Sequence, residues 1–100
     1  MANTIKKLAY MPYAQAHVEI TPNGDTYLFS YCTLVIELTT NGWLTCTGIY
    51  SATTRKHIGA FMREYVTWPN GTKANYHDAK AAYMGGYRLN VLTGEIEDVN

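Results

Sequence analysis

The sequence has only two cysteines and three prolines among its 100 residues, and its formal net charge at pH 7 is zero. Two cysteines are too few for a disulfide-stabilised scaffold. Residues 1–13 lack a hydrophobic signal region and no run of roughly 18 apolar residues occurs, so we expect a soluble, intracellular protein without membrane contact. The balanced charge argues against an indiscriminate nucleic-acid binder, which needs a strongly basic surface.

Catalytic and metal-binding motifs are also missing. No Cys or His spacing matches a zinc site, and neither a nucleophile motif nor a glycine-rich phosphate loop occurs. His17, His57 and His77 are spread along the sequence, so their spacing predicts no catalytic dyad. We therefore expect no enzymatic activity, no metal and no cofactor. Cys32 and Cys46 lie in strand-like apolar runs, where we expect reduced, buried thiols.

The hydrophobic residues, 47% of the chain, are enough for one core. We expect a single domain over residues 1–100, with residues 1–15 and 93–100 less ordered. The first predicted hairpin joins residues 18–20 to 26–30 through an Asn-Gly turn. A two-residue loop there would pair Ile20 with Tyr27 and gather apolar side chains on one face.

The second predicted hairpin joins residues 33–39 to 43–50. A three-residue loop with Gly42 in the left-handed conformation pairs Leu38 with Leu44, whereas a two-residue loop would mix apolar and polar partners. Val35 would then lie on the face opposite the core. The predicted core face consists of alternate residues: Leu34, Ile36, Leu38, Leu44 and Cys46. A bend or bulge between residues 30 and 33 would align this face with that of the preceding strand.

Two helices are predicted after the hairpins. Apolar residues recur with helical period over residues 53–65, and a shorter helix begins after Asn75, a good N-cap, and ends at Gly85-Gly86. A last strand follows around Leu89. The expected class is α+β: an antiparallel sheet of three to five strands with two hairpins, one main helix packed on it and a second short helix.

The entry to the longer helix carries positive charge where a helix N-terminus is already positive. Hydroxyl groups, free N–H groups and cations together are typical of a phosphate or carboxylate site. The candidate anion-binding residues are Ser51, Thr53, Thr54, Arg55, Lys56 and His57. The alternative is that Ser51 or Thr53 merely caps the helix while Arg55 and Lys56 point into water, which costs about 0.3–1 kcal/mol each.

The chain has nine tyrosines, more than a core of this size needs. Exposed Tyr and Trp side chains can anchor a protein interface or stack on bases, although they also occur around the rim of a small core. The candidate interface residues are Tyr31, Trp43, Tyr50 and Trp68. Residues 51–80 carry five Lys or Arg against two acidic residues, so nucleic-acid binding through this segment is the alternative function.

Two motifs lie within residues 26–65: Leu28-Phe29-Ser30-Tyr31-x-Thr33-Leu34-Val35 and Tyr50-Ser51-x-Thr53-Thr54-Arg55-Lys56-His57-x-x-x-Phe61. In these motifs the chain resembles a group of small uncharacterised proteins from bacteriophages, prophages and mobile elements of gut-type bacteria. The resemblance carries no known activity. It implies a non-enzymatic accessory protein in the cytoplasm of a bacterial host that binds a host protein, including components of antiviral defence, or a phosphate-containing ligand. An unpaired sheet edge leaves homo-oligomerisation open.

Overall fold

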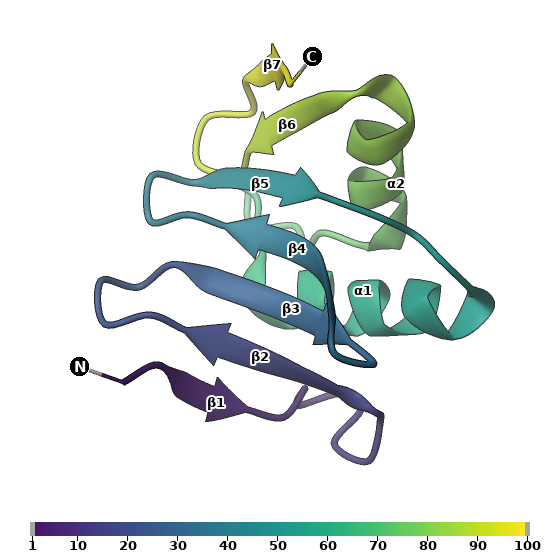
Figure 1. Cartoon of the computed structure of the whole chain (residues 1–100). Helices are drawn as coiled ribbons and strands as arrows, with labels where there is room; N and C mark the ends of the chain where they lie inside the picture. Colours follow the sequence, from purple (N-terminus) through teal and green to yellow (C-terminus); the bar gives the residue numbers. More distant parts are fainter. Residues whose placement is uncertain (1, 100) are drawn as a thin grey trace.

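The computed structural model describes residues 2–99 and contains one seven-stranded antiparallel sheet with two helices packed behind it (Figure 1). The strands follow one another in the sheet in sequence order. The elements are β1 (Thr4–Lys6), β2 (Ala16–Ile20), β3 (Thr26–Ser30), β4 (Thr33–Leu38), β5 (Trp43–Cys46), α1 (Ala52–Tyr65), α2 (Tyr76–Gly85), β6 (Tyr87–Asn90) and β7 (Ile96–Asp98). The helices therefore form one unit of the chain between β5 and β6.

The α+β class is as predicted, but the strand count of three to five is wrong. Three further connections are hairpin-like: β1 to β2, β3 to β4 and β6 to β7. The two edge strands β1 and β7 have three residues each and are exposed throughout, so no apolar alternation marks them in the sequence. β1 and β7 lie within residues 1–15 and 93–100, the two segments expected from the sequence to be less ordered.

Two hairpins use the same three-residue loop. In β4–β5 the N–H of Thr39 donates to the Trp43 carbonyl, Gly42 has φ +92° and Leu38 faces Leu44, as predicted. In β2–β3 the N–H of Thr21 donates to the Asp25 carbonyl, and the intervening Gly24 is again left-handed. The predicted two-residue loop is therefore wrong for β2–β3.

The corrected register moves the aromatic residues of β3 away from the core. Ile20 pairs with Thr26 rather than Tyr27, and Val18 pairs with Leu28, so Val18 and Leu28 are fully buried. Phe29 lies on the opposite face, where the ring of His17 stacks on it at 4.9 Å. A period of two in a strand means that a shift of one residue exchanges the two faces.

A bulge in β4 brings the apolar faces of the β2–β3 and β4–β5 hairpins to the same side of the sheet. Leu28 pairs with Ile36 and Phe29 with Leu34, which leaves Val35 as the extra residue of β4. Val35 and Ile36 are both fully buried, so the assignment of Val35 to the opposite face is wrong. The bulge lies within β4 rather than between residues 30 and 33, and it turns two consecutive side chains into the core.

The helix α2 begins and ends as predicted, and α1 begins one residue before the predicted start, with Ser51, one of the two predicted caps, as its N-cap. The Ser51 hydroxyl accepts the N–H of Thr54 at the start of α1. Asn75 and Asp78 form a capping box at the start of α2, and Gly86 ends that helix in the left-handed conformation. The stripe of α1 that packs on the sheet contains the buried residues Ile58, Phe61 and Met62. Neither helix in residues 2–99 has the length and apolar character needed to cross a membrane.

Substitution of Gly42 tests the hairpin geometry. A Cβ at Gly42 would lie 2.7 Å from Leu92 Cγ, whereas a Cβ at Gly71, which has a similar φ of +89°, would meet no atom within 4 Å. We expect Gly42→Ala to lower the free energy of unfolding by about 2 kcal/mol or more, and Gly71→Ala by about 1 kcal/mol. Chemical denaturation measures both. Equal losses would mean that the crowding around Gly42 has no energetic cost.

Candidate functional site

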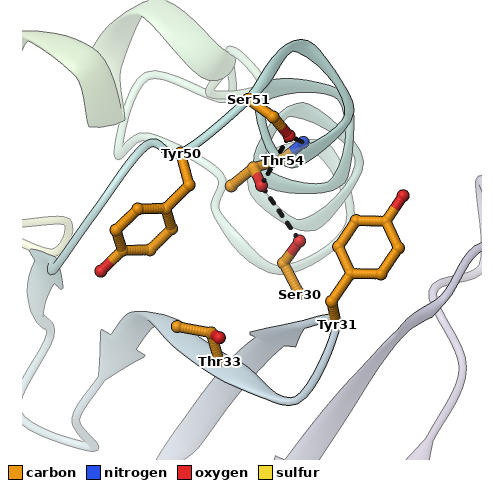
Figure 2. A pocket seen from close by; sticks show the side chains of 6 residues that line it. All are labelled: Ser30, Tyr31, Thr33, Tyr50, Ser51 and Thr54. Atoms are coloured by element: carbon orange, nitrogen blue, oxygen red, sulfur yellow. Dashed lines mark hydrogen bonds between the residues drawn. The ribbon is translucent and has the colours of Figure 1, made fainter.

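A pocket of about 380 Å³ opens where the β3–β4 turn meets the N-terminus of α1. Figure 2 shows two tyrosine rings on either side of it and a row of hydroxyl groups between them. The lining residues are Ser30, Tyr31, Thr33, Tyr50, Ser51 and Thr54. Its volume falls within the usual range of small-molecule sites. The lining contains no charged side chain.

The floor of the pocket is a chain of hydrogen-bonded hydroxyl groups. Ser51 Oγ lies 3.2 Å from Thr54 Oγ1, which lies 3.3 Å from Ser30 Oγ. Ser30 Oγ in turn lies 2.8 Å from Nδ1 of His57. The side chains of Ser30, Thr54 and His57 are all buried, so this network links the helix to the end of β3 beneath the pocket.

The predicted anion-binding residues divide into three groups around α1. Ser51 and Thr54 face the pocket, and His57 lies below it with only 1% of its surface exposed. Burial lowers the pKa of His57 and keeps its ring neutral at physiological pH. His57 therefore acts as a buried hydrogen-bonding group rather than as a surface cation.

Arg55 and Lys56 lie on a different side of the helix. Together with Ala52 and Gly59 they line a second pocket of about 460 Å³, which Tyr76 and His77 of α2 complete. Thr53 is partly exposed and lines neither pocket. The predicted cations and the predicted hydroxyl groups thus belong to two neighbouring surfaces at one helix entry.

Two of the four predicted interface residues form the walls of the first pocket. Tyr31 is 52% exposed and Tyr50 is 63% exposed. The ring of Tyr31 also contacts the ring of His57, with centroids 5.6 Å apart. The two tryptophans lie elsewhere: the guanidinium of Arg88 covers Trp43 at 4.4 Å, and Trp68 packs against the hydrophobic core.

The β3–β4 turn holds Tyr31 in an unfavourable conformation. Tyr31 and Cys32 have φ values of +52° and +70°, and a two-residue hairpin loop needs such positive values at both positions. Glycine and asparagine adopt them readily, whereas other residues pay about 1–3 kcal/mol each. Cys32 is exposed in this turn, so the prediction that both cysteines are buried is wrong for it and holds for Cys46.

The sequence pattern did not mark Ser30 and Thr33 as site residues. Ser30 occupies a core-facing position of β3, and a hydroxyl at such a position indicates a polar partner beneath the sheet. The core-facing position of Ser30 follows only from the observed register of β3. Within residues 2–99 no three His, Cys, Asp or Glu side chains gather as metal ligands would.

The chain belongs to a family of unknown function (DUF8033), whose model matches residues 4–80. The match runs from β1 into α2 and includes every residue that lines the first pocket. Neither the curated proteins nor the solved structures contain a significant match to the chain.

The buried position of His57 predicts how stability depends on pH. Its pKa is lowered from the ordinary value of 6.5 in the folded state, so the unfolded chain binds more protons once the pH falls below about 6.5. Stability that depends on neutral His57 is present above this pH and is lost as the pH falls through the folded pKa.

We expect the free energy of unfolding to decrease between about pH 7 and about pH 5, and to decrease less in His57→Gln. Urea denaturation at several pH values measures this slope. His77→Gln is the matched control because His77 is exposed. The same slope in His57→Gln and in the wild-type protein would contradict this role for His57.

Proposed function

We propose that this protein binds a small molecule of the nucleotide class, with the planar base held between Tyr31 and Tyr50. The observation that carries the proposal is the left-handed turn at Tyr31, in which an aromatic residue replaces the asparagine or glycine that stability alone would favour. Residues held in unfavourable conformations cluster at functional sites, where the strain presents a side chain that the function needs.

The chemistry of the pocket fits the base of such a ligand. Two tyrosine rings offer stacking surfaces, and stacking on an aromatic ring is worth about 1–3 kcal/mol per base. Hydroxyl groups both donate and accept hydrogen bonds. Ser51 and Thr33 therefore suit the edge of a base, which carries both donors and acceptors. Phosphate groups would lie outside the uncharged lining, in the positive field of the α1 N-terminus and of Arg55 and Lys56.

In the cell, the proposed role is that of a non-enzymatic accessory protein of a bacteriophage or mobile element. It would act in the cytoplasm of the bacterial host by binding a host factor or a host nucleotide, and so serve host takeover or the inhibition of an antiviral defence. The resemblance of residues 26–65 to phage and prophage proteins supports this setting, and a sequestered ligand requires no catalytic step.

The second candidate function is nucleic-acid binding. It is favoured by the second pocket, because Arg55, Lys56 and His77 come together there from the N-terminal parts of two helices. The two functions differ in their response to salt. Binding to a phosphate backbone weakens steeply as the salt concentration rises, whereas stacking of one base in an uncharged pocket changes little.

Replacing the residues of the β3–β4 turn by residues that favour positive φ should change the stability of the protein and its affinity for nucleotides in opposite directions. We expect the double variant Tyr31→Asn/Cys32→Gly to raise the free energy of unfolding by about 1 kcal/mol or more, because Asn-Gly adopts the required positive φ values without strain. The same variant should bind nucleotides at least roughly tenfold more weakly, since one wall of the pocket is gone. Denaturation and isothermal titration calorimetry measure the two effects. A variant that is more stable and binds as well as the wild-type protein would refute the proposed function.

Tyrosine substitutions with a matched control test the stacking. We expect Tyr50→Ala to reduce the affinity for nucleotides by roughly tenfold or more, and Tyr13→Ala, which removes a side chain that is 97% exposed and outside the pocket, to change it little. The rise in melting temperature with a panel of nucleotides gives the readout. Equal effects of the two substitutions, or no shift with any nucleotide, would contradict base binding at this pocket.

A further inference from the structure

Apart from the pocket, the large exposed apolar side chains belong to the segments at the two ends of the sheet and to the end of α2. Ile5 of β1 is 65% exposed, and Tyr10 and Tyr13 are exposed in the connection from β1 to β2. Around β7 and the end of α2 the exposed residues are Tyr83, Met84, Leu92, Ile96 and Val99. β1 and β7 are also the edge strands, and within residues 2–99 no further strand pairs with the outer side of either (Figure 1). Each end therefore presents unpaired backbone groups beside apolar surface.

The two ends carry opposite charge. Lys6 and Lys7 lie at the β1 end, and Glu95 and Asp98 lie at the β7 end beside Glu97, which is paired with Arg88 of β6 at 2.8 Å. A second copy that approached with the same edge would bring like charges together, which is destabilising in paired strands. A second copy that approached with the other edge would bring lysine beside carboxylate.

The strand register places complementary charges on the same face of the sheet. Lys6 lies opposite Val18, whose side chain is buried under the helices. At the other end Asp98 lies opposite Tyr87, two positions from the pair of Leu89 with Ile96. Leu89 in turn lies opposite the buried Leu44, so these side chains also point to the helix side. Lys6 and Asp98 would therefore lie on the same face if β1 and β7 were joined, and would be neighbours in the register that sets Thr4 beside Ile96.

We infer that copies of this chain associate head to tail, with β1 of one copy beside β7 of the next, and so extend the sheet between copies. All neighbouring strands are antiparallel and there are seven, so β1 and β7 run in the same direction and the junction is a parallel pair. Such an interface uses two different surfaces and leads to a closed ring or an open filament. This inference goes beyond ligand binding and is independent of it, because neither edge strand lines the pocket.

Charge reversal tests the junction. Sedimentation velocity of the wild-type protein over a range of concentrations should show a species larger than the monomer at low salt, and less of it at high salt. Lys6→Glu and Asp98→Lys should each raise the dissociation constant by roughly tenfold or more, because like charges then meet across the junction. The double variant Lys6→Glu/Asp98→Lys should restore association, since the pair is re-formed with the charges exchanged.

The matched control is Lys80→Glu, which makes the same change of charge at an exposed position of α2. Thermal unfolding of each variant verifies that it is folded. A wild-type protein that stays monomeric at every concentration would overturn the inference. So would association that is unaffected by Lys6→Glu, or a double variant that fails to recover.

Discussion

The hydroxyl group of Ser30 joins the sheet to the first helix, and the geometry of the site depends on this contact. Ser30 Oγ is hydrogen-bonded to Nδ1 of His57 and lies 3.3 Å from Thr54 Oγ1, and all three side chains are buried. Thr54 Oγ1 has a second partner in Ser51 Oγ, whereas the hydrogen bond of His57 Nδ1 is to Ser30. A buried polar group without a partner costs about 1–3 kcal/mol, so the position of α1 that brings His57 to the end of β3 is favoured. That position brings the N-terminus of the helix, with Ser51, beside the β3–β4 turn and creates the pocket between them.

The turn that borders the pocket differs from the other two turns between β2 and β5 in the residues that adopt positive φ. The β2–β3 and β4–β5 loops each place a glycine at the left-handed position, which is the least costly solution for a tight turn. The β3–β4 turn has the same need for positive φ and meets it with Tyr31 and Cys32. The chain thus follows the local rules at two turns and departs from them at the third, which borders the pocket. Departures of this kind are expected where function rather than stability selects the residue.

Local signals predicted much of the fold. The cap at Asn75 and the register of the β4–β5 hairpin followed from neighbouring residues, and the structure confirms them. For α1 the sequence offered Ser51 or Thr53 as the cap, and in the structure the cap is Ser51. The strand count was wrong because β1 and β7 are short and exposed, and the β2–β3 register was wrong because pairing Ile20 with Tyr27 also gathered apolar residues. Of the site, the sequence indicated the helix entry and the exposed tyrosines Tyr31 and Tyr50. It could not indicate that Arg55 faces a different pocket or that Ser30 and His57 meet, because these depend on the tertiary position of α1.

The most direct test of nucleotide binding at the helix entry is to follow the backbone amide resonances of the protein while nucleotides are added. The proposed site predicts that the largest chemical-shift changes fall on the β3–β4 turn and the first turn of α1, at Tyr31, Thr33, Ser51 and Thr54. Changes confined to Lys56, Gly59 and His77 would place the ligand in the second pocket instead. The absence of any change at saturating nucleotide would contradict the account.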